Sequence, residues 1–256
     1  MSEGPARPIP LPRPHAGERL RLALLGGWSL HCDGVGVPVS SNGQRLLALL
    51  ALRGRTQRDL VAGTLWPAND DQSALANLRT TLWRVRRRVP GAIVGNGAEV
   101  ELGGQLSVDV HELTSTGERL LREDPVEPIA DWAAIGHTLA KQDPLLPGWY
   151  EDWVLAERER LQQLQVHALE IAAERLVQSS QLATALEVAQ AATVVEPFRE
   201  TAHCAVVEVL LKQSNPAQAL RHYRRYEQLL DRELGIEPSR RLRELVRPML
   251  GDHVRA

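Results

Sequence analysis

The sequence has few cysteines and no long apolar run, and both shortages narrow the class of protein. Its two cysteines, Cys32 and Cys204, lie far apart in a chain of 256 residues, so they provide neither a disulfide framework nor a four-ligand zinc site. We expect both to be packing thiols. The longest apolar run, Leu46 to Leu52, is far shorter than the roughly 20 residues that span a bilayer, and no apolar signal core follows the N-terminus. We therefore expect a soluble cytoplasmic protein that makes no membrane contact.

Motifs for catalysis and for metal binding are also missing. His111-Glu112 lacks the second histidine of a zinc-protease pair, and His203-Cys204 is an isolated couple. The segment from Gly27 to His31 departs from a nucleophile elbow at its last position, and no glycine-rich run ends in Gly-Lys-Ser or Gly-Lys-Thr. The sequence thus predicts no enzyme, no metal site and no cofactor.

The charged residues divide the chain into two unlike halves. Residues 1–108 carry 13 arginines against 8 acidic residues, a net charge of +5, while residues 109–256 carry 17 basic against 24 acidic residues, a net charge of −7. We expect the two halves to meet different partners. Residues 1–18 contain five prolines and little that is apolar, so we expect a disordered arm there. The 43% of apolar residues is sufficient for one or two buried cores.

The basic half begins with strand-like patterns and continues with helical ones. Leu20, Leu22 and Leu24 alternate with less apolar residues, and an Asp33-Gly34 turn signal follows, which predicts a small antiparallel sheet. Capping-box spacings at Ser41–Gln44 and, more weakly, at Thr56–Asp59 predict two helices, the second of which ends at Pro67. A third helix is predicted from Asp70 or Asp71 to Pro90.

This third helix has one apolar face and one cationic face. At 100° per residue a stripe falls within an arc of about 80°, and it consists of Leu75, Leu78, Leu82, Val85 and Val89. The opposite face presents Ser73, Ala76, Asn77, Thr80, Arg84 and Arg87. Short polar side chains followed by arginines suit the major groove of DNA, and a solvated helix face is the alternative. Arg79 and Arg86 lie beside the stripe, where intramolecular ion pairs are a further interpretation.

A hairpin follows the third helix and completes a known arrangement. Ile93-Val94 and Val100 to Leu102 flank Gly95-Asn96-Gly97, whose Asn-Gly pair readily adopts positive φ. A sheet, three helices and a terminal hairpin predict a winged helix-turn-helix, with the hairpin as the wing and the third helix as the reader of DNA.

Three segments carry a family resemblance: Gln44 to Leu50, Leu65-Trp66-Pro67 and Leu82 to Arg87. They resemble the OmpR/PhoB-type DNA-binding domain of the Streptomyces antibiotic regulatory proteins, whose third helix enters the major groove. By position, the resemblance implies that Thr80, Arg84 and Arg87 are the first DNA-binding candidates, followed by Asn77 and Arg88.

Two positions depart from the family pattern. Where family wings carry a Gly-Tyr pair, this chain has Glu99 and Val100, followed by Glu101. Because carboxylates repel phosphate, we expect a weak wing contact. Trp83 stands where the family often has a small polar residue. Its side chain is predicted either to contact a sugar-phosphate edge of DNA or to pack on the wing.

The acidic half is predicted to be all-helical and repetitive. At an offset of 34 residues six identities fall within a 19-residue window, which indicates a tetratricopeptide-like helix-turn-helix repeat. Such an array provides a groove for a protein partner, and dimerisation or support of the reader domain are the alternatives. Leu145 to Val154, Phe198-Arg199-Glu200 and Glu233 to Pro238 resemble the bacterial transcriptional activation domain of the same family.

These patterns predict a mostly α fold with a small antiparallel β part, in which residues 19–108 form the winged helix and residues 109–256 the all-α tetratricopeptide-like domain. The resemblance implies a transcriptional activator of a biosynthetic gene cluster that binds direct repeats in promoter DNA, as a homodimer or as tandem protomers, and recruits RNA polymerase. Two alternatives remain open: a helical-repeat adaptor with a vestigial winged helix, and a regulator that responds to a small ligand.

Overall fold

The computed structural model describes residues 20–122 and 131–250, which form two compact units. One unit runs up to His111 and also includes Leu146–Trp149, and the other comprises the remaining residues. The predicted disordered arm lies outside the described residues. Among the helices of the described ranges, none is long and apolar enough to cross a membrane.

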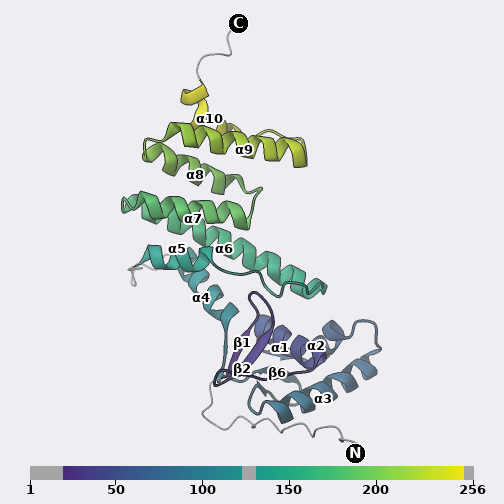
Figure 1. The fold of residues 1–256 in the computed structure, drawn as a ribbon. Helices are drawn as coiled ribbons and strands as arrows, with labels where there is room; N and C mark the ends of the chain where they lie inside the picture. Colours follow the sequence, from purple (N-terminus) through teal and green to yellow (C-terminus); the bar gives the residue numbers. More distant parts are fainter. Residues whose placement is uncertain (1–19, 123–130, 251–256) are drawn as a thin grey trace, which may run out of the picture. The chain divides into compact units, whose positions relative to one another are not determined.

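The first unit contains two small sheets (Figure 1). The four-stranded sheet has the order β3-β2-β1-β7 and comprises β1 (Leu20–Ala23), β2 (Ser29–Cys32), β3 (Val35–Gly36) and β7 (Leu106–Val108). The three-stranded sheet has the order β4-β6-β5 and comprises β4 (Thr56–Gln57), β5 (Ile93–Val94) and β6 (Glu99–Leu102). β1 pairs antiparallel with β2, as predicted, so that Leu22 lies opposite Leu30. β7 adds an unpredicted parallel strand to the other side of β1.

Three helices complete the first unit: α1 (Ser41–Arg53), α2 (Arg58–Leu65) and α3 (Asp71–Arg88). The predicted capping box at Ser41 is wrong, since the N-cap is Ser40 and no side chain caps the helix. Instead, the Gln44 side chain donates a hydrogen bond to the carbonyl of Val39 at 3.0 Å. The apolar run of α1 is the centre of this core, because Leu46, Leu47 and Leu49 are all fully buried.

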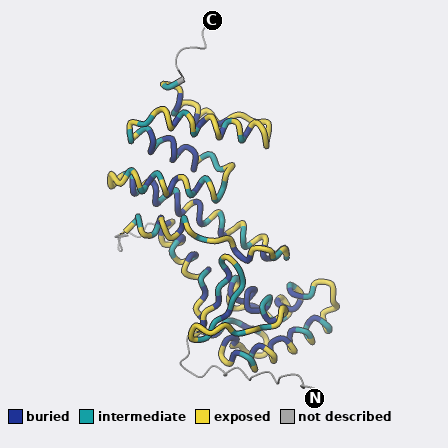
Figure 2. The backbone as a smooth tube through the Cα atoms, viewed as in Figure 1, coloured by how far each residue is buried: buried dark blue, intermediate teal, exposed yellow. Residues whose placement is uncertain are grey.

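The second unit is helical throughout its described part. Its helices are α4 (Asp109–Arg122), α5 (Trp132–Ala140), α6 (Asp152–Gln178), α7 (Leu182–Val195), α8 (Glu200–Lys212), α9 (Pro216–Leu234) and α10 (Arg240–Leu250). α4 begins in the first unit and continues into the second. Helices α6 to α10 stack in successive layers (Figure 1), and the buried residues follow the faces between the layers (Figure 2).

The turns of this stack confirm the repeat of 34 residues. Ser180 and Ser214, which are 34 positions apart, both adopt the left-handed conformation, with φ of 61° and 57°. In each turn the next residue returns a backbone hydrogen bond to the helix just completed, from Gln181 to Leu176 and from Asn215 to Leu210, at 2.9 Å in both cases. The turns that join α6 to α7 and α8 to α9 therefore have the same geometry, as repeated helix-turn-helix units require. The predicted fold class is confirmed.

Candidate nucleic-acid interface

Helix α3 begins and ends where the sequence predicts. Asp70 is the N-cap, and its carboxylate accepts a hydrogen bond from the backbone N–H of Ser73 at 3.0 Å. This bond lowers the pKa of Asp70, because it stabilises the charged carboxylate. Leu78, Leu82 and Val85 are buried in the core of the first unit. The burial of these residues leaves the opposite face of α3 free for solvent or a ligand.

The five predicted DNA-binding residues all lie on the outer part of α3. Thr80, Arg84 and Arg87 are exposed, whereas Asn77 and Arg88 are half-buried. The Thr80 hydroxyl donates a hydrogen bond to the carbonyl of Ala76 at 3.0 Å, which leaves its oxygen able to accept another. Within the described ranges, neither Arg84 nor Arg88 forms an ion pair or a hydrogen bond. Their guanidinium groups are therefore available to an external anion.

Trp83 lies beside this face and is largely exposed. Its side chain is 58% exposed, and the guanidinium of Arg87 lies 5.2 Å from the centre of its ring. A cation at this distance is attracted by the electrons of the indole. Trp83 thus restricts the conformations of Arg87, and its contact with a sugar-phosphate edge or with the wing stays a prediction.

Ion pairs were one interpretation of Arg79 and Arg86, and neither residue forms one with any residue that the structure describes. Arg86 Nε donates a hydrogen bond to the carbonyl of Ile93 at 3.3 Å, and so links α3 to β5. Arg79 is exposed and has no charged partner among the described residues. Cationic charge therefore extends beyond the predicted face along one flank of α3.

The wing turn is organised by Asn96, whose side-chain oxygen accepts hydrogen bonds from the backbone N–H groups of Ala98 and Glu99, both at 2.9 Å. Gly95 has a φ of +143°, and a Cβ there would lie 2.3 Å from the carbonyl oxygen of Glu99. Glu99, expected to repel phosphate, is paired with Arg55 at 2.7 Å. The repulsion expected from the wing is therefore partly compensated within the protein.

Helix α2 contributes to this surface although no sequence pattern predicts it. Arg58, the first residue of α2, lines a hollow of about 400 Å³ together with residues of α3. Its Nε atom is buried and has no hydrogen-bond partner among the described residues. Only tertiary packing brings Arg58 beside α3, so no local pattern could have identified it.

The helical unit has a second candidate surface, a groove of about 490 Å³ between α6, α8 and α10. Glu170 and Glu174 line it on α6, Glu208 and Lys212 on α8, and Arg241 on α10. Small residues of α6 and α8, Ala173 and Ala205, form part of its floor. The groove thus combines both signs of charge with small apolar side chains.

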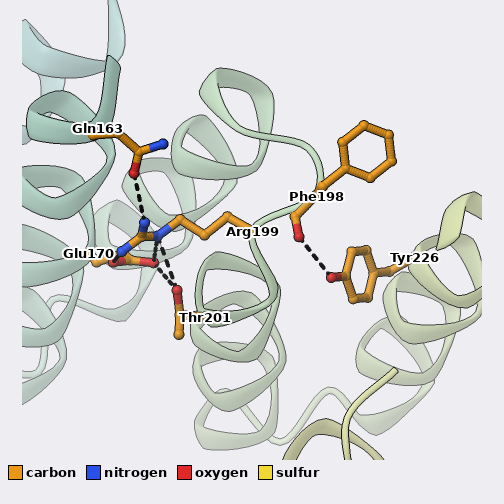
Figure 3. A network of polar contacts seen from close by, with 6 residues as sticks. All are labelled: Gln163, Glu170, Phe198, Arg199, Thr201 and Tyr226. Atoms are coloured by element: carbon orange, nitrogen blue, oxygen red, sulfur yellow. Dashed lines mark hydrogen bonds and ion pairs between the residues drawn. The ribbon is translucent and has the colours of Figure 1, made fainter. Parts of the chain in front are cut away.

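An arginine outside the groove holds one of its carboxylates (Figure 3). Arg199 donates two hydrogen bonds to Glu170, from Nε at 2.8 Å and from Nη2 at 3.0 Å, and a third to Gln163 at 3.2 Å. The hydroxyl of Thr201 also donates to Glu170. The Glu170 carboxylate raises the pKa of Arg199, because it stabilises the charged guanidinium.

The winged helix of the first unit and the stacked helical repeats of the second form the architecture of a class of transcription regulators. The Bacterial transcriptional activator domain family matches residues 108–250. The chain therefore belongs to the Streptomyces antibiotic regulatory protein family of transcriptional activators.

Two regulatory proteins of Streptomyces and one solved structure are similar to this chain. Regulatory protein DnrI of Streptomyces peucetius is 25% identical, over 90% of this chain and 92% of DnrI. Regulatory protein AfsR of Streptomyces coelicolor is 29% identical over 90% of this chain, which spans only 24% of the length of AfsR. Among solved structures, Mycobacterium tuberculosis EmbR in complex with a low affinity phosphopeptide shares the fold, with a TM-score of 0.69 and 19% identity over 93% of this chain and 67% of that chain.

Proposed function

We propose that this activator binds direct repeats in promoter DNA as tandem protomers, with α3 in the major groove, and recruits RNA polymerase to a biosynthetic gene cluster. Residues 19–108 serve as the DNA-binding domain and residues 109–256 as the activation domain. Thr80, Arg84 and Arg87 read base edges or contact phosphates, with Asn77 and Arg88 beside them. The match of residues 108–250 to the bacterial transcriptional activator domain supports the activating role of this part of the chain.

One observation carries the assignment of α3. On its outer side Arg79, Arg84 and Arg88 have no carboxylate partner among the described residues, while the apolar side of the same helix is buried. Guanidinium groups concentrated on one rigid helix repel each other unless anions are bound nearby. Duplex DNA supplies such anions at regular spacing, and its major groove is wide enough for a helix.

Replacement of Arg84 and Arg87 by alanine tests this assignment. The DNA target is first selected by the protein from a library of random-sequence duplexes, and binding is then measured by fluorescence anisotropy. We expect the double variant to lose the preference for the selected duplex over an unrelated one, by about 100-fold for two lost contacts. The matched control removes Arg221 and Arg224, two exposed arginines with the same spacing on α9. Unchanged preference in the α3 variant would remove α3 from the reader role.

The tandem arrangement is tested by the spacing of the half-sites. Insertion of about half a helical turn, roughly 5 base pairs, between the repeats rotates one protomer to the other side of the duplex. We expect cooperative binding to be lost, and a full turn to restore part of it. Equal binding at every spacing would show that the protomers dock independently.

Recruitment of polymerase is tested by transcription in vitro from the selected promoter. We expect the unaltered protein to increase the amount of transcript, and the Arg84→Ala, Arg87→Ala variant to have no effect at the same concentration. An unaltered protein that binds the promoter and leaves transcription unchanged would contradict the recruitment step alone.

The groove between α6, α8 and α10 favours a second function, the response to a small ligand. Its volume of about 490 Å³ falls within the range of ligand pockets, and it presents charged groups of both signs. Thermal unfolding of the full chain in the presence of pathway metabolites tests this function. An increase in melting temperature that disappears in the Glu174→Gln variant would support it, and no increase with any compound would contradict it.

A further inference from the structure

A hollow on one flank of α3 brings four arginines and an exposed tryptophan together. Its lining consists of Arg58, Arg79, Leu82, Trp83, Arg86 and Arg87. In the part of the chain that the structure describes, no acidic residue lines it. We refer to this group of residues as the arginine clamp.

Several guanidinium donors of the clamp have no partner among the described residues. Arg58 Nε is buried and has no partner among the described residues, and Arg79 has no ion pair there. Arg87 is held over the ring of Trp83 at 5.2 Å. A buried donor without a partner destabilises the fold, and converging like charges add to that cost. An oxyanion in the hollow would relieve both costs, because guanidinium groups bind phosphate through paired, charge-assisted hydrogen bonds.

The position of the clamp on α3 indicates which phosphate it fits. At 100° per residue, Arg79, Trp83 and Arg86 lie on one flank of α3, Arg88 on the other, and Arg84 and Arg87 at the outer face. A helix with its side chains is about 10–12 Å wide and the major groove about 12 Å, so each flank faces one phosphate wall of the groove.

We infer that the arginine clamp binds a backbone phosphate of one DNA strand, next to the major groove that holds α3. The inference rests on the proposed function and adds Arg58, Arg79 and Trp83 to the DNA-binding residues. Arg58 and Arg79 neutralise the phosphate, while Trp83 positions Arg87 between the clamp and the base edges. A phosphate contact carries no sequence information, so the clamp contributes affinity and register and no base preference.

The test compares charge removal with charge retention in the clamp. The Arg58→Gln, Arg79→Gln variant and the Arg58→Lys, Arg79→Lys variant are assayed on the selected duplex and on an unrelated duplex over a range of salt concentrations. The matched control, Arg21→Gln with Arg53→Gln, removes two charges from β1 and α1. Thermal unfolding of each variant verifies that the first unit remains folded.

We expect the glutamine variant to lose affinity about equally for both duplexes, with a slope of log K against log salt that is shallower by about 1 per lost phosphate contact. The lysine variant should recover most of the slope, because an ammonium group still neutralises phosphate. An unchanged slope in the glutamine variant would overturn the clamp, as would a loss confined to the selected duplex. Saturable binding of inorganic phosphate to the clamp, without effect of the variant on DNA affinity, would assign the hollow to a free anion and overturn the inference. An unaltered protein without any DNA affinity would overturn the proposed function as well.

Discussion

The arginines of α3 and Arg199, which follows α7 and contacts α6, differ in whether a carboxylate of the protein pairs with them. On α3, Arg79, Arg84 and Arg88 have no carboxylate partner within the described residues. In the helical unit, Arg199 donates two hydrogen bonds to Glu170, and the two side chains are only 20% and 17% exposed. The charge of Arg199 is used within the protein, whereas that of α3 is available to a partner.

The difference shows that pairing and burial, rather than the number of arginines, distinguish a binding surface from a structural contact. Both arrangements use a guanidinium, which is always charged and donates in a fixed planar geometry. Where a carboxylate is supplied by a neighbouring helix, the arginine fixes that helix in place. Where none is supplied, the anion must come from outside.

A carboxylate placed on α3 should have the largest effect, because it would pair an arginine that now has no carboxylate partner among the described residues. In Thr80→Glu the new carboxylate lies one turn before Arg84, so it can pair with that guanidinium. We expect DNA affinity to fall by more than about 100-fold, because a contact is neutralised and a negative charge is introduced beside phosphate. The free energy of unfolding should change by no more than about 0.5 kcal/mol.

Fluorescence anisotropy and urea unfolding of the same sample measure both quantities. Thr80→Gln is the control, since it has a similar size and no charge. If Thr80→Glu and Thr80→Gln bind DNA with equal affinity, the unpaired arginines of α3 do not determine binding.

The reverse change removes the paired arginine. In Arg199→Ala the part-buried Glu170 carboxylate loses its main donors, so we expect the helical unit to lose about 2 kcal/mol of stability. DNA affinity should be retained, since α3 is unaltered. Urea unfolding followed by circular dichroism measures the loss.

Arg240→Ala is the matched control for Arg199→Ala. Arg240 also pairs with a carboxylate, that of Glu244, yet the two side chains are 88% and 50% exposed. Because solvent screens such a pair, its loss should change stability by less than about 0.5 kcal/mol. Equal losses in the two variants would show that burial does not determine the strength of these ion pairs.

The sequence predicts α3 better than any other part of the surface, and the reason is local. A stripe of period 3.6, an N-cap at Asp70 and a stop at Pro90 all lie within the helix or next to it. The same local reasoning failed at Ser41, whose capping-box spacing was not used because Ser40 is the N-cap. A spacing alone does not decide which of two adjacent serines takes the cap position.

Features that depend on distant contacts were not predictable. β7 is three residues long and gains its parallel pairing only when β1 is already in place. Leu146 donates a backbone hydrogen bond to Leu24 at 2.8 Å, which places Leu146–Trp149 in the first unit although the chain around it belongs to the second. Arg58 joins the α3 surface in the same way, through packing of α2 against α3.

Acid should lower the stability of the helical unit. In this respect the unit differs from α3, whose proposed function depends on salt concentration. Burial, together with the nearby His203 and Arg225, lowers the pKa of His222 from 6.5 to about 4. Burial also lowers the pKa of His203, whose Nδ1 atom lies 3.0 Å from Nε2 of His222. Both rings are therefore neutral in the folded protein at pH 7.

The unfolded chain takes up a proton at His222 near pH 6.5, whereas the folded chain does so only near pH 4, so stability decreases as the pH falls through this window. Between pH 7.5 and pH 5.5 we expect a loss of about 1.3 kcal/mol from His222. Urea unfolding at the two pH values measures it, with His222→Gln expected to reduce the difference and replacement of the exposed His167 by glutamine to leave it unchanged. A buried imidazole makes the protein sensitive to acid only if the fold lowers its pKa. Equal stability of the unaltered protein at both pH values would therefore show that burial does not lower the pKa of His222.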